Sequence, residues 1–411
     1  MHDAMLNPAM RGAINPCIVG AAMIHSAPHD LGTTQTMKFN FFHSMPWVHY
    51  EGVPTSWPVG SGGFDGPRGK ALYDDYITSM IHAEACEFDW IACNEHHYSP
   101  FSLMPNCNLI ASIIAHRTNK AKVAVLGNLV PLLNPVRVAE EYAMIDVMSG
   151  GRLIAGLMRG IPHEYLAYNV APGSSQARMR EATELIIKAW TEPEPFGWEG
   201  EYYQFPSISI WPKPYQKPYP QLLMSATNPD AADLAARYRA IIGMVFVQDL
   251  DWGRNISDGY RKAAAAHGWE ATREHILVGE HAVIADTDEE ALAIMKRGHD
   301  YLHRVLMRPQ RDAQRIVIEK TRFYGDNRER ADNFQSKLAL IRTRSVEESI
   351  EAGSILCGSP ASVVKQMKKI NKAIGNGIFS LNFKVGDVPE PIVRRGMELF
   401  RDQVLPEMRD V

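Results

Sequence analysis

The strongest constraint on the fold is a repeated alternation of short apolar strands with helices along most of the chain. The clearest unit begins at Asn134, an N-cap that is followed by Pro135 at the first helical position, and its helix runs to Met148. Gly150 and the glycine after it end this helix, and the apolar segment 153–158 follows as a strand. A strand–helix–strand crossover enforces parallel strands. The pattern therefore predicts a parallel α/β sheet.

Further apolar segments continue the alternation on both sides of this unit. The expected strands are 38–45, 90–94, 122–126, 153–158, 222–225, 241–247, 276–284 and 377–383, and the expected helices are 71–87, 106–117, 135–148, 179–190, 230–238, 256–267, 288–297, 359–374 and 390–407. About eight strands with helices between them fit a closed barrel better than the five or six strands of a doubly wound sheet. We predict an α/β fold, a (β/α)8 TIM barrel with insertions.

Two regions fall outside the alternation. Residues 1–36 show neither helical nor strand periodicity, so we expect an N-terminal extension, irregular in part, before a single barrel domain over residues 37–411. Residues 46–70 hold several glycines and prolines together with Trp47 and Trp57, which indicates a long loop inserted into the barrel. Such loops are usually disordered or functional, and the aromatic residues favour the second.

Composition disfavours several classes of partner. The formal net charge is -4, with 43 Lys and Arg against 47 Asp and Glu and no long basic run, so nucleic acid is not an expected partner. The longest apolar run near the start, Cys17 to Ile24, is too short to cross a bilayer, and no clear secretory signal surrounds it. Five cysteines without a CxxC pair indicate neither a disulfide framework nor a cysteine zinc site. We predict a cytoplasmic protein.

Glu95, His96 and His97 follow the second expected strand directly. Active sites of barrels gather at the carboxyl ends of the strands, so these residues are candidates for catalysis. Neighbouring strand residues point to opposite faces, and the two histidines are therefore poorly placed to share a metal ion; no metal site is predicted. The alternative is a packing histidine held by a hydrogen bond. The chemistry of the residues leaves both interpretations open.

Three further strand ends carry residues suited to a cofactor. Arg159 can grip a phosphate through its planar guanidinium, or it can be a solvated surface arginine. Gly127 and Asn128, just past the third strand, can let a flat ring lie against the backbone, or they form an ordinary turn. Thr227 and Asn228 lead into a helix N-terminus that can bind an anion, or they only cap that helix.

Four segments resemble, in order and spacing, the bacterial-luciferase-like flavin-dependent monooxygenases. They are WIACNEHHY, LNPVRVAEEYAMIDVMSGGRLIAGLMRG, ILCGSPASVVKQM and ELFRDQVLPEMR. The likeness covers about residues 37–411, and its most specific part runs from Asn134 to Gly160. The sequence departs from the family pattern at Asn134, where a histidine is usual, and at Met158. These departures leave the orientation of the flavin and the substrate side open.

The resemblance gives the candidate residues expected roles. His96 would stand beside the flavin, and Glu95 would support it. Arg159 would bind the flavin phosphate, with Thr227 and Asn228 as its companions. The glycine–asparagine pair after the third strand would lie against the isoalloxazine ring, in this family often through a non-proline cis peptide.

The resemblance also implies an activity, which is that of a two-component, FMN-dependent monooxygenase. Reduced FMN reacts with O2 to a C4a-(hydro)peroxide that oxygenates a small organic substrate, and a separate NAD(P)H-dependent flavin reductase supplies the reduced FMN. The alternatives are a deazaflavin-dependent enzyme that transfers hydride and a non-catalytic flavin-binding protein. The family further implies a homodimer, and the sequence does not name the substrate.

Overall fold

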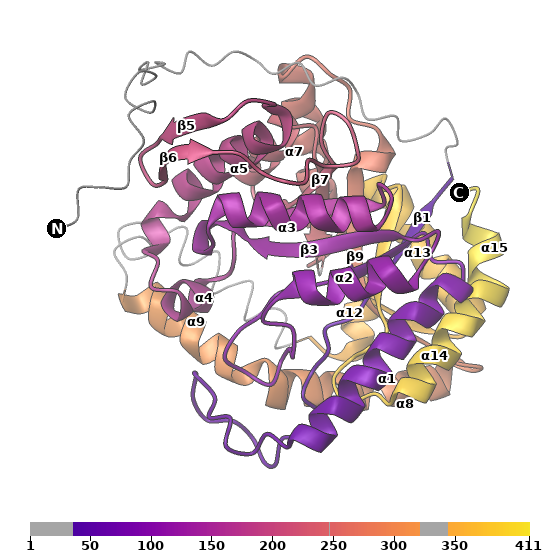
Figure 1. Ribbon diagram of the computed structural model, residues 1–411. Coiled ribbons are helices and arrows are strands. Elements are labelled where there is room, and N and C mark those ends of the chain that lie inside the picture. Colours follow the sequence, from indigo (N-terminus) through magenta and orange to yellow (C-terminus); the bar gives the residue numbers. More distant parts are fainter. Residues whose placement is uncertain (1–35, 246, 321–343) are drawn as a thin grey trace, which may run out of the picture. The chain divides into compact units, whose positions relative to one another are not determined.

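Eight described strands pair in parallel and close into a ring in the computed structural model (Figure 1). They are β1 Lys38–Phe42, β2 Trp90–Cys93, β3 Lys122–Leu129, β4 Leu153–Met158, β7 Gln221–Ser225, β8 Ile241–Val245, β9 Ile276–Ile284 and β11 Ile378–Asn382. The pairing runs β1-β2-β3-β4-β7-β8-β9-β11 and returns from β11 to β1. The predicted (β/α)8 TIM barrel is confirmed. We call the carboxyl ends of these strands the mouth of the barrel.

The structure describes residues 36–245, 247–320 and 344–411. The predicted N-terminal extension lies outside these residues except for Thr36, and it stays a prediction. Cys17 lies outside them as well, and the other four cysteines are free thiols and buried. In the described part of the chain, no helix has both the length and the apolar character that crossing a membrane requires.

Helices connect the strands and pack around the ring (Figure 1). They are α1 Gly66–Ala85, α2 Cys107–Arg117, α3 Pro135–Met148, α4 Pro162–Ala167, α5 Ser175–Thr191, α6 Pro229–Arg237, α7 Leu250–Ala266, α8 Asp288–Tyr301, α9 Arg308–Lys320, α12 Val346–Ala352, α13 Pro360–Ile374, α14 Glu390–Leu399 and α15 Leu405–Met408. One π-helical turn, 302–306, extends α8, and another, 400–404, joins α14 to α15. The helix expected over 390–407 is therefore one run with a π turn inside it.

Some elements were not predicted from the pattern. The antiparallel hairpin of β5 Phe196–Glu199 and β6 Gln204–Ile208 follows α5, and β10 Ile355–Gly358 adds to the carboxyl half of β9. Their short runs lack the length that makes periodicity readable.

The unit around α3 follows the sequence in detail. The side-chain oxygen of Asn134 accepts hydrogen bonds from the backbone N–H groups of Val136 and Arg137, at 3.0 and 3.3 Å. Helix α3 ends at Met148, and Gly150 after it adopts a positive φ of 67° that a glycine tolerates without cost. The departure from the family pattern at Asn134 is thus an exposed helix cap.

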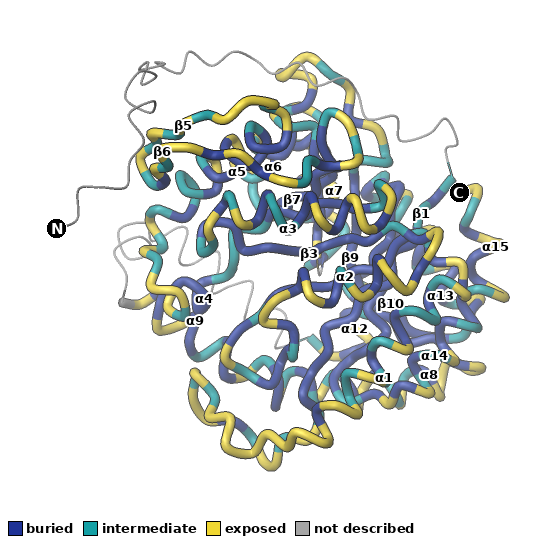
Figure 2. Tube along the Cα trace, viewed as in Figure 1, coloured by how far each residue is buried: buried dark blue, intermediate teal, exposed yellow. Residues whose placement is uncertain are grey.

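Strand alternation divides the core into an interior and an outer layer. One or two residues from each of the eight strands fill the interior of the ring: Phe42, Trp90, Ala92, Ala124, Ile154, Leu223, Ile241, Leu277 and Ile378. The residues between them point outward and pack under the helices. Figure 2 shows the barrel strands as buried, whereas the β5–β6 hairpin is largely exposed. The interior is therefore a packed core below the mouth, as in other barrels of this kind.

A buried carboxylate ties the carboxyl ends of β1 and β11 to α1 and α14. The Oε1 atom of Glu390 accepts from Lys384 Nζ at 3.1 Å and lies 3.4 Å from His43 Nε2, and its Oε2 accepts from the Ser79 hydroxyl at 2.5 Å. The backbone N–H of Met45 donates to His43 Nδ1, so Nε2 carries the proton that faces Glu390. Burial acts to raise the pKa of Glu390, but these partners outweigh it and lower the pKa to about 2.

We predict that Glu390→Gln lowers the free energy of unfolding by roughly 3 kcal/mol at neutral pH, because it breaks a buried ion pair. The folded pKa lies below the ordinary value of 4.5, so the stabilisation is present above about pH 4.5 and is lost as the pH falls toward 2. Urea unfolding of both proteins across this range measures the difference. The exposed pair of Glu351 and Lys369 offers a control, Glu351→Gln, for which we expect no measurable change. A difference that does not shrink with falling pH would contradict the assignment.

Candidate functional site

Glu95, His96 and His97 follow β2 at the mouth, and their side chains form two separate hydrogen-bonded pairs. His96 Nδ1 lies 2.9 Å from Glu164 Oε1, whereas His97 Nε2 lies 3.2 Å from Glu95 Oε1. The support of His96 by Glu95 that the resemblance implied is therefore not what the structure shows. These three residues lie beyond β2, which ends at Cys93, and their contacts divide them: Glu95 and His97 bond each other, whereas His96 bonds Glu164 of α4.

Glu164 fixes the ring of His96. It lies in the first turn of α4, where its Oε2 accepts from the backbone N–H of Ile161 at 2.9 Å. Burial acts to raise the pKa of Glu164, but the hydrogen bond and charge of His96 outweigh it, and the net shift is downward. A carboxylate only accepts, so His96 Nδ1 must donate and Nε2 of the neutral ring carries the lone pair. The His96 side chain is 22% exposed, whereas Glu164 is buried.

The other pair lies behind His96 in the outer layer. Tyr168 OH lies 3.3 Å from His97 Nδ1, and the Cys107 thiol donates to Glu95 Oε2 at 3.6 Å. Burial raises the pKa of Glu95 against the opposing effect of His97. Burial and the charge of Glu95 also raise the pKa of Cys107 well above its usual value, so this thiol stays protonated. These groups stabilise the barrel wall, and the protonated thiol of Cys107 is not suited to act as a nucleophile.

Gly127 and Asn128 lie inside β3, not just past it as predicted. The strand continues to Leu129 through an irregularity in its register with β4, and the peptide bond before Gly127 is cis. A Cβ atom on Gly127 would lie 2.5 Å from the carbonyl oxygen of Gly156 in β4, and one on Gly156 would lie 1.8 Å from the carbonyl oxygen of Val125. Only glycines fit this close approach of two backbones.

Arg159 follows β4 at the mouth and is half-buried. Within the described ranges, it makes no ion pair with a carboxylate. The next residue, Gly160, has a φ of 88°, and its carbonyl oxygen accepts from Tyr165 OH at 3.2 Å. A half-buried cation without a protein anion suits a phosphate ligand better than the solvated surface arginine that was the alternative.

Thr227 and Asn228 connect β7 to α6. Asn228 caps the helix, because its Oδ1 accepts from the backbone N–H of Ala231 at 3.0 Å. Thr227 is exposed. Leu157 of β4 pairs with Met224 of β7, so Arg159 and the start of α6 lie on neighbouring strand ends. The structure thus places all the predicted site residues along one arc of the mouth, over β2, β3, β4 and β7.

Trp57, from the loop that the sequence indicated as functional, contacts residues beside the His96–Glu164 pair. The loop over residues 46–65 precedes α1, and its Val59 N–H donates to the carbonyl oxygen of Tyr98. The ring of Trp57 in this loop lies 5.7 Å from that of Tyr98 and 5.4 Å from that of His163 in α4. His163 is fully buried, and burial lowers its pKa to about 4. Local sequence carries no signal for such contacts, because they join two loops and a helix that are far apart along the chain.

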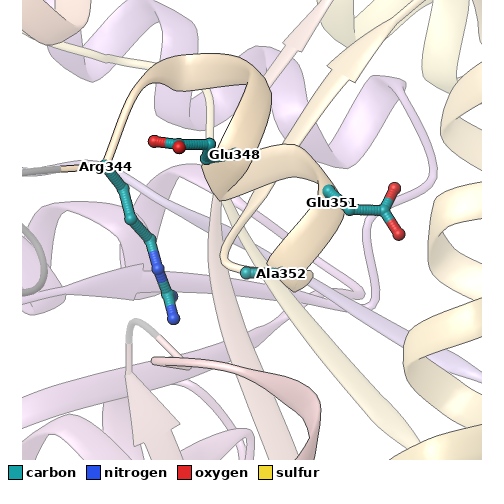
Figure 3. Close-up of a pocket in the computed structure, with 4 residues that line it drawn as sticks. All are labelled: Arg344, Glu348, Glu351 and Ala352. Atoms are coloured by element: carbon teal, nitrogen blue, oxygen red, sulfur yellow. The ribbon is translucent and has the colours of Figure 1, made fainter.

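A pocket beside α12 lies apart from these residues (Figure 3). Arg344, Glu348, Glu351 and Ala352 line it, and the Arg344 guanidinium donates to the carbonyl oxygen of Gln248 after β8. None of the predicted site residues lines this pocket. Across residues 36–245, 247–320 and 344–411, no three His, Cys, Asp or Glu side chains gather in a way that could hold a metal ion.

Comparison with known proteins gives relatives over most of the chain. Residues 60–376 match the family described as luciferase-like monooxygenase. The oxygenase component of a flavin-dependent trigonelline monooxygenase from Acinetobacter baylyi is 27% identical over 258 residues, which cover 62% of this chain and 67% of the relative.

Solved structures share the fold at low sequence identity. The oxygenating constituent of 3,6-diketocamphane monooxygenase from Pseudomonas putida, in complex with FMN, gives a TM-score of 0.69 at 20% identity over 91% of this chain and 99% of that one. An F420-dependent secondary alcohol dehydrogenase gives a TM-score of 0.64 at 16% identity over 91% and 99%.

Proposed function

Because the chain belongs to the luciferase-like monooxygenase family, we propose that it is a monooxygenase that uses reduced FMN and O2 to oxygenate a small organic substrate. The observation that carries the proposal is the arc of strand ends at the mouth. Along this arc, a buried carboxylate orients His96, two glycines let β3 and β4 approach closely, and the guanidinium of Arg159 makes no ion pair with a carboxylate that the structure describes. The named relative, a flavin-dependent oxygenase component, supports it.

The residues of the arc fit the two ends of FMN. Arg159, with the backbone N–H groups of Thr227 and Asn228 before α6, would hold the phosphate. The backbone of Gly127 and Asn128 would lie along the isoalloxazine ring, at the irregularity in the pairing of β3 with β4. Bound in its reduced form, the flavin supplies the electrons that activate O2.

The protein contributes a positioned proton acceptor and a shielded mouth. His96 Nε2 carries the lone pair, so it can accept a proton from the substrate and later give that proton back. Glu164 stabilises the His96 ring while the ring carries the positive charge. The 46–65 loop contacts residues on both sides of this pair through Trp57. We propose that this loop limits the entry of water, which would otherwise compete with the organic substrate.

The first test separates oxygenation from hydride transfer. The purified protein is loaded with reduced FMN under nitrogen and mixed with ¹⁸O2 and one of three probes: trigonelline, an aliphatic aldehyde or a cyclic ketone. We expect one ¹⁸O atom in the product of at least one probe, measured by mass spectrometry. The same probes with reduced F420 (F420H2) and no oxygen test the alternative, and probe-dependent oxidation of F420H2, with hydride transferred to the probe, would favour a deazaflavin-dependent oxidoreductase. Tight FMN binding without turnover of any probe would favour a non-catalytic flavin-binding protein.

We predict that Arg159→Met weakens the binding of FMN about tenfold or more and leaves riboflavin binding unchanged, because riboflavin lacks the phosphate. Fluorescence titration measures both dissociation constants. Arg178→Met is the control, since Arg178 lies over the ring of Tyr202. Equal losses for FMN and riboflavin would place Arg159 away from the phosphate.

We predict that Glu164→Gln lowers kcat by 10- to 100-fold, roughly the effect of removing a group that orients a histidine. The flavin dissociation constant should change little, because Glu164 is not among the proposed flavin contacts. The measurement is steady-state oxygenation of the probe that the first test identifies. Glu95→Gln is the matched variant, as it removes a buried carboxylate that bonds His97 instead. A larger loss from Glu95→Gln would restore the role that the resemblance gave to Glu95.

We further propose two partners, a separate NAD(P)H-dependent flavin reductase and a second copy of the chain. The side of the barrel formed by α2 and α3 exposes large apolar side chains at helical spacing: Leu109, Ile113, Met144, Val147 and Met148. Exposed apolar patches of this kind mark protein interfaces. Sedimentation velocity of the purified chain tests the homodimer, and oxygenation driven by NADH with an added reductase tests the other partner.

A further inference from the structure

The side chain of Asn128 is held from behind β3 by the side chain of Asn108 in α2. Asn108 Nδ2 donates to Asn128 Oδ1 at 3.1 Å, and Asn128 Nδ2 donates to Asn108 Oδ1 at 3.0 Å. Both residues are buried, at 5% and 2% exposure. A reciprocal pair of buried amides couples the two side chains, because flipping one amide alone would set oxygen against oxygen and NH2 against NH2.

Glu141 in α3 determines the orientation of the Asn108 amide. The second N–H of Asn108 Nδ2 donates to Glu141 Oε2 at 2.6 Å, and Glu141 Oε1 accepts from Arg137 Nε at 2.7 Å. A carboxylate accepts and cannot donate, so the NH2 group of Asn108 must face Glu141. A flipped Asn108 amide would set its oxygen against the carboxylate. Glu141 therefore fixes Asn108, and Asn108 in turn fixes Asn128.

The same helix also holds the backbone around Asn128. Tyr142, the residue after Glu141, donates from its hydroxyl to the carbonyl oxygen of Gly156 at 2.5 Å and lies 3.5 Å from the backbone nitrogen of Asn128. Burial raises the pKa of Tyr142 well above its usual value, so the hydroxyl remains a donor. Helix α3 thus holds Asn128 in two ways. Tyr142 contacts the backbone of Asn128, and Glu141 acts on the side chain of Asn128 through Asn108.

We infer that Asn108 is a positioning residue for the flavin, with Glu141 as the group that sets its orientation. The inference rests on the proposed function, in which the backbone of Gly127 and Asn128 lies along the isoalloxazine ring. Asn108 does not reach the mouth itself, and it acts by holding Asn128 in one conformation. Without it, the Asn128 side chain loses its buried partner and its backbone gains freedom beside the ring.

The first experiment compares two substitutions of a buried asparagine by leucine. Asn108→Leu should raise the dissociation constant of FMN about tenfold and shift the absorption spectrum of the bound oxidised flavin, because an unpaired buried amide rearranges. Asn376→Leu is the matched control. Asn376 is also buried, and it donates to the carbonyl oxygen of Ile378 at the amino end of β11, at the other end of the barrel. It should lower the melting temperature without changing the affinity or the spectrum.

The second experiment tests the orientation and remains informative if Asn108→Leu fails to fold. Asn108→Asp sets two carboxylates together and should weaken FMN binding about tenfold, and adding Glu141→Gln should recover most of the loss because a glutamine amide can donate. Wild-type FMN affinity is measured first. If the wild type does not bind FMN, the proposed function and this inference both fall. If it binds and the Asn108 variants bind equally well with an unchanged spectrum, or if Glu141→Gln gives no recovery, the inference alone is overturned.

Discussion

The two-residue alternation of side chains along the strands is the constraint from which the core of the barrel follows. Within the ring, it places Phe42, Leu277 and their counterparts in the interior and their neighbours under the helices. In the segment after β2, side-chain contacts separate His96 from Glu95 and His97. One histidine then faces α4 and the mouth, and the other is committed to the outer layer. Two adjacent histidines consequently have different chemistry.

Sequence could predict those parts of the fold that are determined by residues close together along the chain. The N-cap at Asn134 and the strand and helix periods depend on nearby residues, and the structure has them as expected. The partner of His96 depends on the tertiary packing of α4 against the loop after β2, so sequence offered the nearer carboxylate, Glu95. The position of Glu164 in the first turn of α4, after a proline, was readable as a helix-start signal, but its contact with His96 was not. The placement of Gly127 within the strand likewise depends on its neighbour across the sheet, Gly156.

The arc over β2, β3, β4 and β7 combines groups of different electrical character. The carboxylate of Glu164 is buried against His96, whereas the guanidinium of Arg159 makes no ion pair with any carboxylate in residues 36–245, 247–320 and 344–411. Between them the backbones of β3 and β4 approach closely at Gly127 and Gly156. The cation suits the charged tail of the proposed flavin, and the carboxylate–histidine pair suits a reaction that moves a proton.

Closure of the ring has a consequence for synthesis on the ribosome. Strand β1 completes its pairing only with β11, and Asn40 and Ser380, which are hydrogen-bonded across this seam, are separated by 340 positions. At 5–20 residues per second, β1 leaves the ribosome roughly 20 to 70 s before its second neighbour exists. For that interval the nascent chain carries an apolar strand whose edge is unpaired. Chaperones bind such edges, and an edge that no chaperone covers is prone to aggregate.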